Sequence, residues 1–153
     1  MRGQLRIHRP AAEADTVSAS SKRLARRRLE PNWQLRGHAF FPPAEELAQI
    51  PTISAARRIR PVQRTLLVHY FTAYCDWYLC GLDPDSGEAY GYVIEPKAEI
   101  RMWSYFDLPT MCLLILPTDP LLIVRRDLQW QPTVAGPIMA RQVRSGPRRS
   151  SSA

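Results

Sequence analysis

The chain has 153 residues, of which 45% are apolar and 23% charged, with a formal net charge of +7. This length fits one domain with a single modest core and is short for two. No apolar run approaches the roughly 20 residues that span a bilayer, and charges occupy the start where a secretory signal needs an apolar segment, so we expect a cytoplasmic protein.

The basic residues are concentrated outside the middle of the chain. Residues 1–64 contain 13 Lys or Arg and five acids, whereas residues 65–135 contain four and nine. The last 18 residues add four arginines and no acid. We therefore expect a mildly acidic folded part between basic arms.

Residues 1–38 combine Ser, Ala and Arg with few large apolar groups, which predicts a disordered basic arm. Its densest cluster of charge is Arg23, Arg26, Arg27 and Arg28. A weak helix over residues 21–29 is an alternative. The Arg-rich start also resembles an organellar transit peptide, although an upstream start codon that adds residues without a fold is the simpler explanation.

The segment 41–50 carries the signals of a short helix. Pro42 and Pro43 suit a first helical turn, two glutamates complement the positive helix start, and Pro51 ends the helix. The following stretch contains Arg57, Arg58, Arg60 and Arg64. We expect this stretch to be an exposed basic connection into the first strand.

The middle of the chain predicts a sheet. Residues 66–71 and 77–82 are apolar on both alternating faces, as is typical of interior strands. Pro84 and Gly87 mark a turn over residues 83–88, after which residues 89–94 return as a hairpin strand. Further strands are expected near residues 100–106 and 127–131, with a Pro-punctuated loop or short helix between them.

Together these elements predict one α+β domain over residues 39–135. It contains a mostly antiparallel sheet of four or five strands, centred on the hairpin of residues 77–94, and one or two short helices. Residues 136–153 are expected to form a basic, Ser-rich disordered tail.

Several blocks, in order and spacing, resemble a bacterial family catalogued as domain of unknown function 2958. They are residues 41–51, Val68–Phe71, Asp76–Asp85, Ala89–Val93, Ser104–Leu108 and Val124–Thr133. Ser104 stands where the family usually has Gly, and Arg125 where it often has Glu. The resemblance implies a small α+β protein of bacteria, often encoded on plasmids and other mobile elements, with no established activity and no catalytic residues to carry over.

Candidate catalytic chemistry is sparse. His69 with Cys75 or Cys80, oriented by Asp76, is the one plausible base and nucleophile pairing, but a histidine satisfied within a sheet is more common. The odd set of Cys75, Cys80 and Cys112 is interpreted as reduced core thiols. We therefore predict no catalytic residues.

Candidate ligand sites are equally weak. No Cys-x-x-Cys pair is present, so no metal site is expected. The acids of residues 83–88 fit a solvated turn better than a calcium loop. Arg125, Arg126 and Asp127 suggest an internal ion pair rather than a phosphate site. No cofactor is predicted.

Two functions remain. The first is a non-enzymatic accessory or interaction module of a bacterial plasmid or other mobile element, which docks an unidentified partner protein through an exposed patch of Tyr90, Tyr92, Trp103 and Tyr105. The alternative is nonspecific, salt-sensitive nucleic-acid binding through basic residues, namely Arg23, Arg26, Arg27, Arg28, Arg57 and Arg58. A small hydrolase ranks third.

Overall fold

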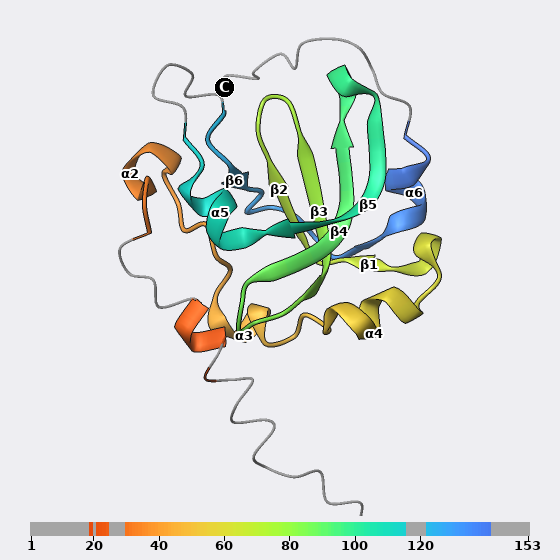
Figure 1. Cartoon of the computed structure of the whole chain (residues 1–153), viewed down its shortest axis with the longest axis horizontal. Coiled ribbons are helices and arrows are strands. Elements are labelled where there is room, and N and C mark those ends of the chain that lie inside the picture. The colour runs from red at the N-terminus through yellow and green to blue at the C-terminus, as the bar shows by residue number, and fades with distance from the viewer. Residues whose placement is uncertain (1–18, 20, 25–29, 116–121, 142–153) are drawn as a thin grey trace, which may run out of the picture.

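The computed structural model describes residues 19, 21–24, 30–115 and 122–141. Five strands form an antiparallel sheet in the order β5-β4-β3-β2-β6 (Figure 1), and β1 pairs with β7 in a separate two-stranded sheet. The strands are β1 Thr65–Leu66, β2 Val68–Phe71, β3 Asp76–Leu82, β4 Glu88–Glu95, β5 Ile100–Asp107, β6 Arg125–Arg126 and β7 Thr133–Val134. The predicted α+β class and antiparallel sheet are confirmed.

Short helices surround the sheet. They are α2 Trp33–Arg36, α3 Ala44–Leu47, α4 Ile53–Arg58, η1 Pro61–Gln63, η2 Pro96–Ala98, α5 Leu108–Leu113 and α6 Ala135–Met139. The short helix expected over residues 41–50 is present as α3. None of the described helices is long and apolar enough to cross a bilayer.

The hairpin of β3 and β4 lies at the centre of the sheet, as the sequence predicts. Asp83 shapes its turn: the carboxylate accepts hydrogen bonds from the Asp85 backbone N–H at 3.0 Å and the Ser86 hydroxyl at 2.8 Å. The Ser86 bond is the main reason that the pKa of Asp83 is lowered. Gly87 supplies the positive φ of +83° that the turn needs.

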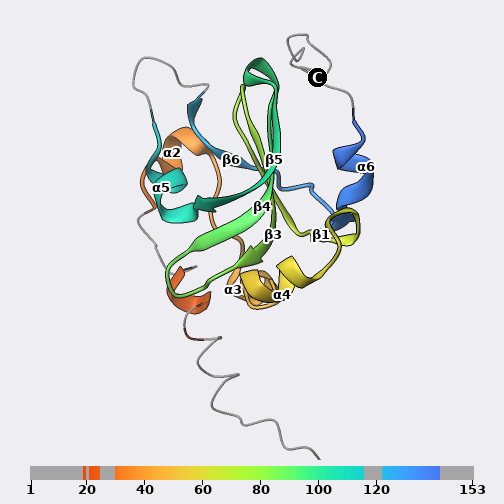
Figure 2. The same cartoon turned by 45° about the vertical axis from the view of Figure 1, so that its right-hand side comes forward.

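The sheet carries a hydrophobic core on each face, which explains why β2 and β3 are apolar on both sides. Figure 2 shows α2 and α5 on one side of the sheet and α6 on the other. The first core comprises Leu24, Phe40, Phe41, Leu47, Val68, Tyr70, Leu79, Leu82, Ala89, Leu108, Met111, Cys112 and Val124. The second comprises Ala56, Leu66, Tyr78, Cys80, Tyr90, Tyr92, Ile94, Ala135 and Ile138.

The strand predicted over residues 66–71 is divided. Thr65 and Leu66 pair with β7, whereas Val68–Phe71 lies between β3 and β6. Leu67 separates the two strands, and its N–H still donates to the Leu79 carbonyl at 2.7 Å. The chain therefore changes partner at Leu67 while it keeps its backbone hydrogen bonds.

Arg57, Arg58 and Arg60 are exposed, as predicted, but Arg57 and Arg58 lie on a helix and not on a plain connection, because residues 53–58 form α4. The Thr52 hydroxyl caps this helix by accepting the Ala55 N–H at 3.3 Å. Gly81 of β3 lets the helix lie close: a Cβ at Gly81 would meet the Ile53 Cα at 3.0 Å. Arg64, expected to be exposed, is only 6% exposed.

The ordered domain extends beyond the predicted limits of 39 and 135. Arg36 is buried, and its guanidinium donates to the carbonyls of Val124 at 2.8 Å and Cys112 at 2.9 Å. Buried Glu30 accepts the N–H of Phe40 at 2.6 Å. At the other end, α6 contributes Ile138 to the second core. Residues 30–38, helical residues 21–24 with Leu24 in the first core, and residues 136–139 of α6 thus belong to the fold and not to disordered arms. The rest of the two predicted arms, apart from residues 19, 140 and 141, lies outside the described residues.

The strand predicted over residues 127–131 is also wrong. Only Arg125 and Arg126 pair with β2, and Asp127 then starts a turn by accepting the Gln129 N–H at 3.0 Å. Arg126 and Asp127 make other contacts in place of the Arg–Asp ion pair that was expected within the domain. Asp127 faces His69, and Nε of Arg126 donates to the Ala39 carbonyl at 3.3 Å.

Candidate interaction surface

Arginines and aromatic rings meet over one end of β4 and β5, in a group that we call the arginine–aromatic cluster: Arg57, Arg64, Tyr90, Trp103 and Tyr105. Arg57 of α4 donates to the Tyr105 hydroxyl at 2.7 Å. Cζ of Arg64 lies 4.4 Å from the centroid of Trp103, within cation–π range, and Nη1 of Arg64 donates to the Tyr90 hydroxyl at 3.2 Å. The cluster joins α4 to the edge of the sheet.

The predicted exposed patch of four aromatic residues is only partly exposed. Tyr90 and Tyr92 are 8% and 5% exposed and belong to the second core. Trp103 is half-buried, and Tyr105 is 47% exposed. The exposure of these rings differs because β4 is an interior strand whose second-core face is covered, whereas β5 is an edge strand.

β5 has one open edge. Among the described strands it pairs only with β4, in an unbroken register from Glu88 opposite Asp107 to Glu95 opposite Ile100. In Figure 2, α5 and α6 lie on opposite sides of β5. Its eight residues contain no proline, and Ile100 and Met102 are 36% and 51% exposed. A long, regular edge of this kind can accept another strand.

His69 lies between two carboxylates in the interior. Its Nε2 is 2.8 Å from Oδ1 of Asp76, and its Nδ1 is 3.1 Å from Oδ2 of Asp127. The imidazole stacks on the Tyr78 ring with a 4.4 Å centroid distance and a 7° interplanar angle. Both ring nitrogens and one ring face are thus in contact within the fold, and His69 links β2, β3 and the turn after β6.

The thiols do not complete a catalytic pair. Burial, with help from the charges of Glu95 and Asp76, raises the pKa of Cys75 to about 12. Burial likewise raises the pKa of Cys80 to about 11, although Arg64 opposes the shift. A thiolate nucleophile needs the opposite change. Among the described residues, Cys75, Cys80 and Cys112 form no disulfide, and no group of three potential metal ligands occurs.

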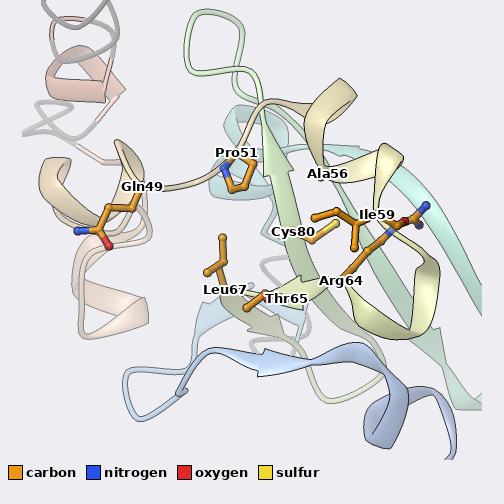
Figure 3. A pocket seen from close by; sticks show the side chains of 8 residues that line it. All are labelled: Gln49, Pro51, Ala56, Ile59, Arg64, Thr65, Leu67 and Cys80. Carbon is orange, nitrogen blue, oxygen red and sulfur yellow. The ribbon is translucent and has the colours of Figure 1, made fainter. Parts of the chain in front are cut away.

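A small pocket of about 220 Å³ opens between α4 and the sheet (Figure 3). Ala56 and Ile59 line one side, Leu67 the other, and Cys80 lies between them. Arg64 also lines the pocket, but its guanidinium already donates to the carbonyls of Ile59 and Arg57 and to the Tyr90 hydroxyl. The pocket is thus a mostly apolar recess that contains one thiol, that of Cys80.

The predicted nucleic-acid residues are divided. Arg23, Arg57 and Arg58 are exposed, whereas Arg26, Arg27 and Arg28 lie outside the described residues. Of these three described arginines, only Arg57 contacts the aromatic rings of the arginine–aromatic cluster. Sequence reasoning missed buried Arg64, whose spacing from Trp103 gives no signal of contact.

No family model, curated protein or solved structure matches the chain. Membership of the bacterial family that the sequence resembles therefore stays a prediction.

Proposed function

We propose that the protein is a non-enzymatic interaction module that binds an extended strand of a partner protein along β5. As part of the same proposal, it is an accessory protein of a bacterial mobile element and works in the cytoplasm, where its thiols stay reduced. The open edge of β5 is the observation that carries this proposal.

Strand addition uses backbone hydrogen bonds for affinity and alternating side chains for specificity. The backbone of β5 offers these groups on the side away from β4. Trp103 and Tyr105 provide aromatic contacts on one face, and Ile100 and Met102 provide apolar contacts on the other. The partner segment therefore carries apolar or aromatic side chains at alternating positions.

The chemistry of the interior favours binding over catalysis. His69 has both nitrogens bonded, and the pKa values of Cys75 and Cys80 are raised. The pocket beside α4 presents the Cys80 thiol, whose pKa is raised to about 11, and Arg64, whose guanidinium is already bonded within the fold.

Site-specific photo-crosslinking in bacterial cells tests the β5 edge. A benzophenone side chain replaces Met102 in the full chain, and a matched control replaces Leu35 of α2, which is 59% exposed. We expect adducts from position 102 alone. Equal yields at both positions, or none at 102, would contradict the proposal.

The protein that is captured is then purified and titrated against the full chain. Met102→Glu should weaken its binding about tenfold, since it places a charge beside the added strand. Leu35→Glu serves as the control with unchanged affinity. Equal affinity for both variants would move the binding site away from β5.

Nucleic-acid binding is the second candidate, because exposed Arg57 and Arg58 lie on α4, which contacts the exposed Tyr105 ring. Fluorescence anisotropy of labelled single-stranded DNA across a salt series tests it. Binding that falls steeply with salt and is weakened by Arg57→Ala with Arg58→Ala would support this function. Affinity that is unchanged in the double variant would exclude a role for α4.

A further inference from the structure

We propose that the strand added to β5 is β5 of a second copy of this chain, antiparallel to the first, with the two Ser104 residues facing each other across a twofold axis. This inference rests on the proposed function, because it uses the same open edge. A twofold interface requires a surface that is complementary to itself. The side chains of β5 meet this requirement in one register.

The charges of β5 are self-complementary about Ser104. Arg101 lies three residues before Ser104 and Asp107 three residues after it. In an antiparallel pair centred on Ser104, Arg101 of each copy is directly opposite Asp107 of the other. Opposite charges at such positions stabilise strand pairing, and symmetry provides the pair twice.

Both side chains can take these partners. Oδ2 of Asp107 accepts the N–H and the hydroxyl of Thr110 at the start of α5, which leaves Oδ1 for the second copy. Arg101 is partly exposed and donates through Nη2 to the Arg141 carbonyl, whereas its Nε is buried without a hydrogen-bond partner among the described residues. A contact with Asp107 of the second copy therefore does not use Nε.

The uncharged positions match in the same register. On the second-core face, Trp103 lies opposite Tyr105 of the other copy, which pairs two aromatic rings. On the first-core face, Met102 lies opposite Phe106, so that the exposed Met102 side chain gains an apolar neighbour. Each pair also occurs twice.

Neighbouring registers lose these matches. A shift that places Trp103 opposite itself puts Arg101 opposite Tyr105, and a shift that places Tyr105 opposite itself puts Asp107 opposite Trp103. Either shift leaves the charged side chains without an opposite charge. The register centred on Ser104 is thus selected by charge and by aromatic pairing together. It joins the two five-stranded sheets into one.

Sedimentation equilibrium of the full chain over a range of concentrations tests the second copy. We expect a mass that rises from 17.5 kDa towards twice that value. Ser104→Lys and Ser104→Glu each place like charges across the axis and should raise the dissociation constant about fivefold. An equimolar mixture of the two variants should recover the dimer, because Lys then faces Glu.

Arg101→Glu is an independent variant that sets two acids opposite each other, and it should also weaken the dimer. Leu35→Lys on α2 is the matched control and should leave the mass unchanged. Circular dichroism confirms that each variant is folded. A wild-type chain that stays at 17.5 kDa, or a mixture that fails to recover the dimer, would overturn the inference.

The crosslinking experiment separates this inference from the proposed function. If the chain is monomeric and position 102 captures a different protein, the inference of a second copy is wrong but the proposed strand binding is supported. An adduct of twice the chain mass supports both. Absence of any adduct at position 102 contradicts both.

Discussion

Nη1 of Arg57 lies 2.7 Å from the hydroxyl of Tyr105, so that α4 is bonded directly to the edge strand of the sheet. The same guanidinium lies 5.7 Å from the Tyr90 ring centroid and 5.8 Å from that of Tyr105. Two sets of residues that the sequence suggests for different functions, arginines for nucleic acid and aromatics for protein docking, therefore meet at one place. A ligand that reaches Tyr105 also meets Arg57.

The coupling between Arg57 and Tyr105 should be measurable but small. In a double-mutant cycle with Arg57→Ala and Tyr105→Phe, we expect a coupling free energy of about 0.5 kcal/mol, because both groups are exposed to water. Urea denaturation measures it. Arg58→Ala in place of Arg57→Ala is the control and should show no coupling to Tyr105.

Gly91→Ala should prevent folding or cost more than about 3 kcal/mol. A Cβ at Gly91 would overlap the Tyr78 carbonyl oxygen on the neighbouring strand, and neither backbone can move without breaking the central hairpin. Expression and thermal unfolding monitored by circular dichroism test this.

Gly37→Ala is the matched control. Gly37 has φ +82° but no atom within 4 Å of its missing Cβ, so alanine there should cost only about 1 kcal/mol for the left-handed conformation. Equal losses for the two variants would show that the contact at Gly91 relaxes.

His69→Phe should destabilise the domain by about 3 kcal/mol at neutral pH. The phenyl ring keeps the stacking on Tyr78 but makes no hydrogen bond with Asp76 or Asp127. Guanidinium denaturation measures the loss. Asp127→Asn keeps an acceptor at a more exposed position and should lower the free energy of unfolding by less than about 1 kcal/mol. A larger loss would contradict the smaller contribution that is assigned to Asp127.

Alkaline pH should destabilise the domain through Cys75. Burial raises its pKa from 9.0 to about 12, so the folded state binds the thiol proton more tightly than the unfolded chain does. The stability from the neutral thiol is complete below pH 9.0 and is lost as the pH rises towards about 12.

Urea unfolding from pH 7 to 11 measures this slope. Cys75→Ala should reduce it, although the raised pKa values of Cys80 and Tyr70 keep part of it. The same raised pKa predicts slow alkylation of Cys75 by iodoacetamide in the folded chain at pH 8 and fast alkylation in urea. An unchanged slope in Cys75→Ala would assign the pH dependence to the other groups.

The elements that were predicted correctly have signals within a few neighbouring residues. The turn at residues 83–88 contains Asp83 and Gly87, whose side-chain bonds and backbone freedom act within a few residues. The two-sided apolar pattern of β2 and β3 reflects cores on both faces. The elements that were predicted wrongly depend on contacts between distant residues. Helix α4 requires its close approach to Gly81, and the turn at Asp127 lies next to His69.

The candidate surface was predicted in part. Tyr105 is exposed and Trp103 half-buried on the edge strand β5, but alternation alone does not show which strand lies at the edge. Tyr90 and Tyr92 have the same sequence character and are buried, because β4 is interior. Arg64 looks like its exposed neighbours in sequence, yet it is covered through contacts with Tyr90 and Trp103.

The sequence by itself determined the α+β class, the central hairpin with its turn and the concentration of charge outside the middle of the chain, since these follow from side-chain alternation, local turn chemistry and composition. Only the tertiary structure decided that β5 has an open edge, that residues 30–38 belong to the fold, and that His69 lies between two aspartates. The physical reason is that strand order and the burial of charge depend on contacts between residues far apart in the chain, as with Arg36 and the Val124 carbonyl.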